Sequence, residues 1–342
     1  MQNTRQHGSP RRAVARGTES TGWPAARGTY APSRDPLRPV RLPAARVTYT
    51  MDTMKASRPW LAILLAACLA PSCAESQALP RAPEAPAAVQ AAAVAVDRPL
   101  AIHPAAEGWE AAAPDVEKVL RSSADALWVY FPERQLRPIL VDPKGGPIVL
   151  FGRGPNGEYR VRLNTGKTYW AQYAFQFAHE FCHILCDYKA DDESNKWFEE
   201  SVCETASLFA LRRMSQTWRA APPYPNWKDF APHLASYAAE RMREVRLPAD
   251  LTLAAWYHQN EAELRKNPCL RDKNRVVAGE LLPLFEKAPE HWESVAWLNA
   301  VTPGKPRSLE QYLADWHERC PPRHKAFVRQ IAERFGIRLE AT

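Results

Sequence analysis

Glycine is scarce in this chain, with 14 residues in 342, whereas proline is frequent at 31. The low glycine content excludes collagen and repeat arrays, and the prolines indicate an irregular linker. Gly166-Lys167-Thr168 resembles the end of a phosphate-binding loop. That loop requires another glycine five positions before Gly166, where Val161 stands, so we expect no nucleotide site.

Positive charge is also scarce outside the N-terminal segment. The formal net charge is +7, but residues 1–53 hold nine arginines against three acidic residues. Lys55 and Arg58 supply two more positive charges, so residues 60–342 sum to about −1. Nucleic-acid binding needs lysines and arginines on the folded part to neutralise phosphates. We therefore expect no nucleic-acid partner.

The chain lacks an apolar run long enough to span a membrane. The apolar run at residues 60–70 is about half of the roughly 20 residues that a transmembrane helix needs. Lys55 and Arg58 precede it and small residues follow it, which is the layout of a secretory signal. We assign residues 54–78 to this signal. Residues 1–53 show no apolar periodicity and are expected to be a disordered extension of the gene model, with Met51 or Met54 as the true start.

Two processing routes follow from the signal. Leu65-Ala66-Ala67-Cys68 resembles a bacterial lipobox, which would leave Cys68 lipidated, whereas cleavage after Ala74 or Ala78 would release a soluble protein. Both alternatives remain open, and both place the protein outside the cytoplasm: periplasmic, secreted, or anchored at the cell surface through Cys68. Residues 79–99 are of low complexity and are expected to be a flexible linker.

The folded part combines short strands with many helices. Helical spacing covers residues 114–131, and β-type runs occupy 138–142, 147–151 and 158–163, the last two forming a hairpin. Helices are expected at 169–188, capped by Thr168, and at about 196–218, capped by Ser194 or Asn195. Beyond residue 226 the patterns are almost entirely helical. The sequence predicts an α+β fold, with a small sheet and active-site helices at 100–218 and an α-helical lobe at 219–342.

His179 and His183 lie four positions apart on the helix predicted at 169–188. They therefore share one face, one turn apart, and two imidazoles at that spacing can bind one zinc ion. Glu180 follows the first histidine and can act as the general base on a water activated by the zinc. The pattern predicts a zinc site with Glu180 as its catalytic residue.

A third ligand is found on the following helix. Glu200, seventeen residues after His183, completes a His-His-Glu set that leaves one zinc position open for water. Glu204 lies one turn further on the same face and can accept the ring N–H of His179. Glu199 competes with Glu200 for the ligand position, and Cys203 is a further alternative.

The pattern His179-Glu-x-x-His183, followed by Trp197-x-x-Glu200 and Glu204, resembles the gluzincin clan of zinc metallopeptidases. The resemblance covers about residues 115–218. It implies a zincin-like unit that hydrolyses peptide bonds, a peptide or protein as substrate, and an edge strand that holds the substrate in extended form. The spacing to Glu200 is shorter than in thermolysin-like enzymes, and the Gly-x-Met-Glu-Asn signature of related aminopeptidases is absent. The resemblance therefore stops at the clan.

Several alternatives stay open at this stage. The rival function is a non-catalytic binding module on a retired zincin scaffold, held by a lipid anchor. A residue that stabilises the oxyanion is also expected, and the candidates are Tyr237, Tyr257, His258 and Tyr312. Five cysteines follow residue 74, and bridges Cys182–Cys203 and Cys269–Cys320 are both conceivable. Oligomeric state and cleavage specificity have no signal in the sequence.

Overall fold

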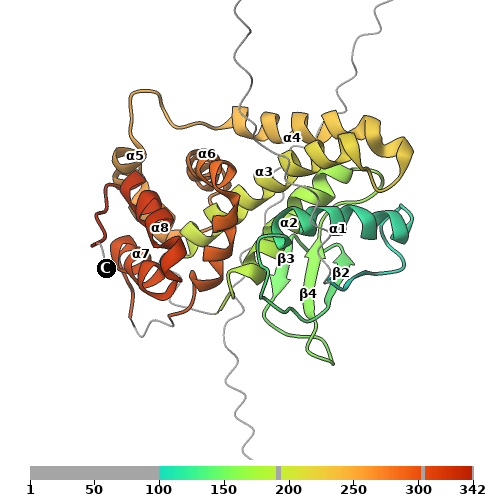
Figure 1. The fold of residues 1–342 in the computed structure, drawn as a ribbon, viewed down its shortest axis with the longest axis horizontal. Coiled ribbons are helices and arrows are strands. Elements are labelled where there is room, and N and C mark those ends of the chain that lie inside the picture. The colour runs from blue at the N-terminus through green and yellow to red at the C-terminus, as the bar shows by residue number, and fades with distance from the viewer. Residues whose placement is uncertain (1–99, 190–193, 302–304, 341–342) are drawn as a thin grey trace, which may run out of the picture. The chain divides into compact units, whose positions relative to one another are not determined.

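The computed structural model describes residues 100–189, 194–301 and 305–340, all within one compact unit. The fold is α+β, as predicted, with one small sheet and a majority of helices (Figure 1). The signal, the linker and Cys68 lie outside the described residues. Within these ranges, no helix combines the length and the apolar character needed to cross a membrane.

The elements follow one another in an order that places all four strands before the second helix. The chain runs through β1 (Ile102–Pro104), α1 (Ala113–Trp128), β2 (Ile139–Pro143), β3 (Ile148–Leu150), β4 (Tyr159–Leu163), α2 (Trp170–Leu185), α3 (Lys196–Ala220), η1 (Pro225–Phe230), α4 (Ala231–Glu244), α5 (Leu253–Lys266), α6 (Arg271–Lys287), η2 (Pro289–Trp297), α7 (Leu309–Arg319) and α8 (Pro322–Arg334).

The sheet has the strand order β1-β2-β4-β3, with β3 at one edge. β1, β2 and β4 are parallel, and β3 pairs with β4 in the antiparallel direction, which is the predicted hairpin. Val141 pairs with Val161, and Val161 pairs with Val149, so three buried valines cross the sheet on one face. Alternation along each strand keeps this face apolar. The helices α1 and α2 pack against the strands.

α2 is the central helix of the fold. Fourteen of its sixteen residues are buried, because it contacts the sheet, α1 and α3. A helix that is apolar on every side belongs in the interior. His179, Glu180 and His183 of α2 therefore lie inside the protein, and their polar groups need partners there.

α3 connects the sheet region with the helical lobe. It packs against α1 and α2 on one side and against α4 and α6 on the other. Aromatic side chains of the helical lobe pack against the first turn of α3. Trp197 stacks on Tyr257 at 5.3 Å between ring centroids, and Phe198 meets Tyr312 at 6.0 Å and Phe335 at 5.8 Å. The lobe thus sets the position of the two residues that follow, Glu199 and Glu200.

Three local details differ from the sequence prediction. Tyr169 is the N-cap of α2 and makes no side-chain cap, so Thr168 does not cap the helix. Asn195 is the N-cap of α3, but its amide donates to the carbonyl oxygen of Arg307 at 3.0 Å instead of capping. β1 is a third difference, because its three residues are too few for a periodic pattern.

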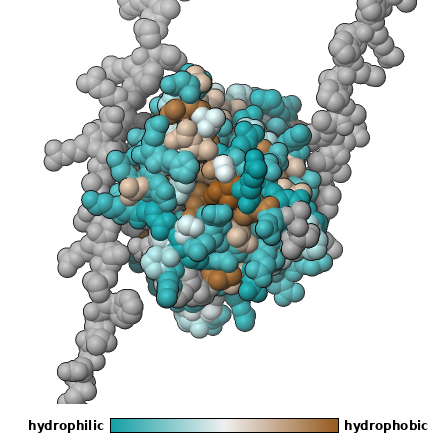
Figure 2. Space-filling view, turned by 90° about the vertical axis from the view of Figure 1, so that its left-hand side faces the viewer, coloured by the Kyte–Doolittle hydropathy of each residue, from teal (hydrophilic) through white to brown (hydrophobic). Residues whose placement is uncertain are grey.

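The surface of the helical lobe is mostly hydrophilic on the side that carries α5, α7 and α8. Figure 2 shows this face with hydrophilic side chains over most of its area and a smaller apolar area near the centre. The large apolar side chains that are exposed, Ile148, Phe151 and Tyr169, belong instead to the sheet region and the start of α2.

Candidate metal centre

The three residues of the histidine motif lie on α2 and are all buried. His179 is 5% exposed, Glu180 is 3% exposed and His183 is 6% exposed. The rings of the two histidines lie 5.0 Å apart, one helical turn from each other. The predicted arrangement of two imidazoles on one face is present.

Glu200 of α3 faces both imidazoles. Its Oε2 lies 3.1 Å from Nε2 of His179, and its Oε1 lies 3.4 Å from Nε2 of His183. Two histidine nitrogens and one carboxylate therefore converge, although the residues come from different helices. The side chain of Glu200 is 14% exposed, compared with 7% for each histidine. The centre is therefore most open on the side of Glu200.

Two of the separations between these atoms are close to those around a zinc ion, whereas the ligand atoms of the two histidines that lie within 4.8 Å of a third ligand atom and of each other do so with Cys203 and not with Glu200. Two ligand atoms that lie 2.0–2.2 Å from one tetrahedral zinc are about 3.4 Å apart. The measured 3.1 and 3.4 Å separations agree with that value. Two imidazoles and a carboxylate are also ligands that zinc prefers. The sulfur of Cys203 lies within 4.8 Å of a nitrogen of each histidine, so a thiolate is a second candidate ligand. Glu200 is favoured because its oxygens approach both Nε2 atoms.

Both carboxylate oxygens of Glu199 accept hydrogen bonds from other side chains. Its Oε1 accepts hydrogen bonds from Nδ1 of His183 at 2.5 Å and from the Lys196 ammonium at 2.8 Å, and its Oε2 accepts from Asn299 at 2.9 Å. Burial raises the pKa of Glu199, but Lys196 and His183 outweigh burial and lower it to about 2. A carboxylate with three donors has no place for a metal ion, so Glu199 orients His183 instead.

Asn299 closes this network from the helical lobe. Besides Glu199, its Nδ2 donates to the carbonyl oxygen of Cys186 at 3.1 Å, and its Oδ1 accepts from the hydroxyl of Tyr312 at 2.9 Å. Asn299 and Tyr312 are 6% and 2% exposed. A buried amide whose donors and acceptor are all satisfied is fixed in one orientation. The chain Tyr312–Asn299–Glu199–His183 therefore holds the second imidazole.

Glu204 has a different partner from the predicted one. Its Oε2 lies 3.9 Å from Nδ1 of His179, which is too long for a hydrogen bond, and this nitrogen has no hydrogen-bond partner among the described residues. Arg275 of α6 is the reason, since its Nε donates to Oε1 of Glu204 at 3.1 Å. Glu204 is near His179, as expected from the helix face, but it is shared with a buried guanidinium.

The environment of Glu180 suits a proton acceptor. Burial raises the pKa of its carboxyl, and the neighbouring histidines offset part of that rise. Raising the pKa of a carboxyl brings it nearer to neutral pH, where a base can both accept and return a proton.

The four candidates for an oxyanion donor lie in different environments. Tyr312 donates to Asn299, Tyr257 is buried against Trp197, and His258 is exposed. Tyr237 lies beside Phe175 of α2, at 5.8 Å between ring centroids. Tyr312 is thus part of the hydrogen-bonded network that holds His183. Tyr237 is the candidate that lines a surface pocket.

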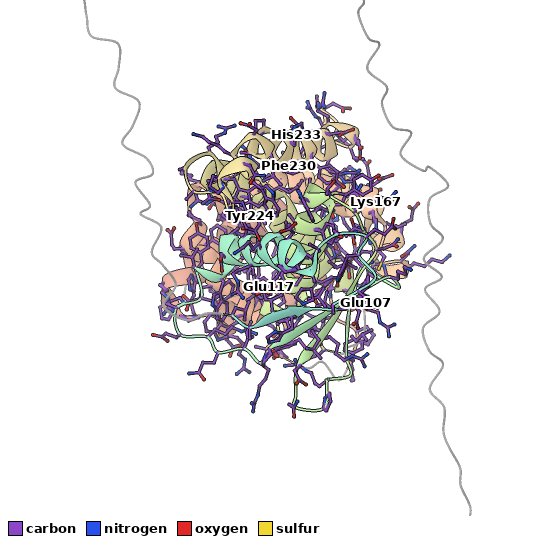
Figure 3. All side chains as sticks on the ribbon, turned by 90° about the vertical axis from the view of Figure 1, so that its right-hand side faces the viewer. Glu107, Glu117, Lys167, Tyr224, Phe230 and His233 are labelled. Atoms are coloured by element: carbon purple, nitrogen blue, oxygen red, sulfur yellow. The ribbon has the colours of Figure 1, made fainter. Side chains whose placement is uncertain are left out.

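Two surface pockets lie near the ends of the central helices. The first, of about 320 Å³, is lined by Tyr237 together with Phe230 and His233; the last two are labelled on one face in Figure 3. The second, of about 370 Å³, includes Arg134, Glu293 and Trp297. Neither pocket is lined by His179, His183 or Glu200.

The five cysteines in the described part of the chain are all free thiols. The bridges Cys182–Cys203 and Cys269–Cys320 are therefore absent from this structure. Cys269 is exposed, whereas Cys320 is 2% exposed and donates to the carbonyl oxygen of His317. Cys182, Cys186 and Cys203 are buried together, within 4.8 Å of one another.

Sequence reasoning missed three residues of this centre: Lys196, Arg275 and Asn299. Lys196 could have been found, because it stands three positions before Glu199 on one helix face. Arg275 and Asn299 had no local signal, since they contact residues 71 and 100 positions away.

Comparison with known proteins gives no relative on which to test these assignments. The chain matches no protein-family model, no curated protein and no solved structure.

Proposed function

We propose that this chain is an exported zinc-dependent metallopeptidase of gluzincin type. The observation that carries the proposal is the convergence of Nε2 of His179 and Nε2 of His183 on the carboxylate of Glu200, with the buried Glu180 beside them. His179, His183 and Glu200 are the proposed ligands of one zinc ion. The resemblance of the motif to the gluzincin clan supports the same assignment.

The surrounding residues prepare the two imidazoles for a metal. Glu199 accepts the Nδ1–H of His183 and so keeps that proton on Nδ1. Nε2 is then the ring nitrogen that is able to bind a metal ion. Glu204 places a negative charge 3.9 Å from Nδ1 of His179 and favours the same tautomer. A metal ion would displace the proton that each Nε2 shares with Glu200 and would then bind the lone pair of that nitrogen.

Glu180 is the proposed general base. In a catalytic zinc site the metal polarises the scissile carbonyl and lowers the pKa of water. Glu180 takes the proton of the attacking water and returns it to the nitrogen of the leaving amine. Its buried position raises the pKa of the carboxyl, which favours its return to the protonated form after it accepts a proton.

The edge strand β3 is the proposed support for an extended peptide. It pairs with β4 on one side only, and α2 packs against it. Ile148 on this strand is 44% exposed and Phe151, directly after it, is 63% exposed. An unpaired strand edge flanked by apolar side chains can add a peptide strand through main-chain hydrogen bonds.

The experiment that tests the proposal is cleavage of a diverse peptide library by the zinc-loaded full chain, followed by mass spectrometry. Glu180→Gln is the matched variant, because it keeps the size of the side chain and removes the base. We expect defined cleavage products that disappear in the variant and with a chelator. Loss of the base should reduce the rate by about 10²- to 10⁴-fold.

One result would favour the alternative of a retired scaffold that only binds a partner. In that case both proteins would retain one zinc ion per chain and neither would cleave any peptide. If neither protein retains zinc, the ligand assignment itself is wrong. Labelling with a radioactive fatty acid separately tests the proposed anchor at Cys68, with Cys68→Ser as the control.

A further inference from the structure

We propose that Cys182, Cys186 and Cys203 form a second metal site, for a thiophilic divalent ion. The three sulfurs lie within 4.8 Å of one another, and the Sγ atoms of Cys182 and Cys186 are 3.9 Å apart. All three side chains are fully buried. The site goes beyond the proposed peptidase, which uses none of these residues.

The backbone fixes the three thiols in place. Cys182 and Cys186 are one turn apart on α2, and the N–H of Cys186 donates to the carbonyl oxygen of Cys182 at 2.8 Å. Asn299 holds the other side of Cys186 by donating to its carbonyl oxygen at 3.1 Å. Cys203 comes from α3, in the region where the two central helices pack most closely. The cluster is therefore built on rigid elements.

The spacing agrees with three sulfurs around one ion. Sulfurs that lie about 2.3 Å from a shared ion are separated by about 3.8 Å in tetrahedral geometry and by about 4.0 Å in trigonal geometry. The separation of 3.9 Å between Cys182 and Cys186 falls in this interval. The sulfur of Cys203 lies within 4.8 Å of both.

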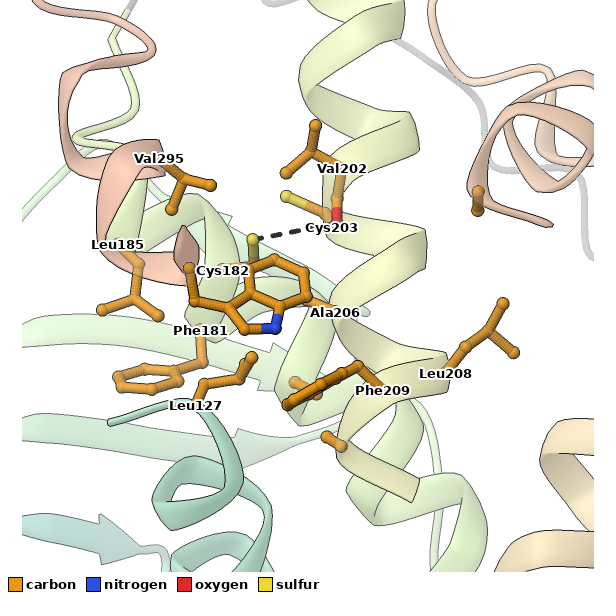
Figure 4. Close-up of a cluster of buried hydrophobic side chains, with 14 of the residues drawn as sticks. Leu127, Phe181, Cys182, Leu185, Val202, Cys203, Ala206, Leu208, Phe209 and Val295 are labelled. Carbon is orange, nitrogen blue, oxygen red and sulfur yellow. Dashed lines mark hydrogen bonds between the residues drawn. The ribbon is translucent and has the colours of Figure 1, made fainter. Parts of the chain in front are cut away.

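The surroundings select a thiophilic ion. Figure 4 shows Cys182 and Cys203 among buried apolar side chains that include Leu127, Val202 and Phe209, and Cys186 belongs to the same hydrophobic core. Hard ions such as Mg²⁺ and Ca²⁺ need oxygen ligands, whereas thiolates bind soft and borderline ions. Three thiolates and a divalent ion carry one net negative charge, and Lys196, whose charge interacts with Cys203, offsets it.

Cys203 also shows how an ion could reach the buried cluster. Its sulfur lies within 4.8 Å of the other two thiols and also within 4.8 Å of a nitrogen of His179 and of His183. The histidine centre is partly open at Glu200, which is 14% exposed at its side chain. An ion that enters at Glu200 therefore passes the histidines and meets Cys203 next.

Cadmium is the probe for this site, because thiolate-to-cadmium charge transfer gives an ultraviolet band that histidine and carboxylate ligands do not give. The full chain is prepared with Cys68, Cys73, Cys269 and Cys320 changed to serine, so that three thiols remain. It is reduced and titrated with Cd²⁺ without oxygen. We expect the band to saturate at one equivalent, with an intensity that corresponds to three thiolates.

Two sets of variants locate the ion. In Cys182→Ala and in Cys186→Ala, the band should lose about a third of its intensity and the cadmium affinity should fall at least about tenfold, since loss of even an outer partner costs that much. In His179→Ala/His183→Ala the band should remain at one equivalent. Retention there separates this site from the proposed zinc centre, which that double variant destroys.

Three results would overturn the proposal. One is the absence of a charge-transfer band in the three-thiol protein whose circular dichroism matches that of the natural chain. Another is a band of unchanged intensity in both cysteine variants. The third is a band that disappears with the two histidines, which would place the ion between His179, His183 and Cys203.

Discussion

Asn299 donates a hydrogen bond of 2.9 Å to Oε2 of Glu199, across 100 residues of sequence. Glu199 in turn accepts from Nδ1 of His183, so the helical lobe orients a proposed zinc ligand through one intermediate. Asn299→Leu keeps the branched shape of the side chain and removes the amide. Because groups that orient metal ligands matter to binding, we expect zinc affinity to fall about 10- to 100-fold, measured by competition with a chelator.

A matched control separates orientation from general damage. Asn260 of α5 also donates a side-chain hydrogen bond, to the carbonyl oxygen of Trp256 at 2.7 Å, but it has no part in the network of Glu199. Asn260→Leu should leave zinc affinity unchanged. An equal loss in both variants would mean that Asn299 acts through stability alone.

Substitutions of the two adjacent glutamates of α3 are predicted to have different effects on zinc binding. Glu200→Gln weakens a proposed ligand and should abolish tight zinc binding. Glu199→Gln removes the charge that holds His183 but no ligand, so zinc should still bind, about 10- to 100-fold more weakly. Metal content after dialysis distinguishes the two variants. The reverse order of losses would assign the ligand position to Glu199.

The buried pair of Glu204 and Arg275 is expected to matter most when one partner is removed. The side chains are 2% and 8% exposed, and Nε of Arg275 lies 3.1 Å from the carboxylate. Arg275→Met leaves a buried carboxylate without its cation and should lower the free energy of unfolding by about 3–5 kcal/mol. Denaturant unfolding measures the effect. Adding Glu204→Gln should recover a large part of the loss, and no recovery would show that the pair is not coupled.

Zinc binding is expected to release a proton from His183. Burial alone would lower the pKa of His183, but Glu200 and Glu199 raise it to about 9. His183 is then protonated at pH 7 and must lose the Nε2 proton when a metal binds. Apparent zinc affinity should rise about tenfold per pH unit up to about pH 9. Calorimetry in two buffers of different ionisation enthalpy counts the proton, and a count of zero would contradict the assignment.

Acid is expected to destabilise the lobe through a histidine pair. Nδ1 of His291 and Nδ1 of His324 are 2.9 Å apart, and the pKa of each ring is lowered, mainly by burial. The unfolded chain therefore binds these protons first, near pH 6.5. The stabilisation from the neutral pair is present above about pH 6.5 and is lost as the pH falls through the lower folded values.

His291→Gln tests this effect, because a glutamine cannot take up a proton. We expect the variant to lose less stability than the natural chain between about pH 6.5 and pH 5, since its unfolded state binds one proton fewer there. Thermal unfolding at several pH values gives the comparison. Parallel curves for the two proteins would show that the pair does not control acid stability.

The elements that the sequence predicted well are those with a strong local pattern. The helix at α2 follows from its periodic aromatic residues, and the histidines share a face because four residues make about one turn. The hairpin of β3 and β4 follows from two apolar runs around a turn rich in glycine. The α+β class follows from this order of elements.

The features that could not be predicted depend on contacts across the chain. Arg275 donates a hydrogen bond to Glu204, which was predicted to accept one from His179 instead. No spacing rule locates an arginine 71 residues later in the sequence. Thr168 is a good capping residue by type, yet α2 begins at Trp170 with Tyr169 as its N-cap. Tertiary packing decided both details, because α2 is buried and its start is set by its neighbours.

The dependence of His183 on Asn299 and Tyr312 also sets an order of assembly. During synthesis α2 and α3 emerge before the segment that holds them, so the three proposed zinc ligands exist in the chain while their support is still missing. A fragment that ends before Asn299 would carry the whole histidine and glutamate pattern without the amide that fixes it. The hydrogen-bonded arrangement around His183 is therefore complete only after Asn299 and Tyr312 have been added to the chain.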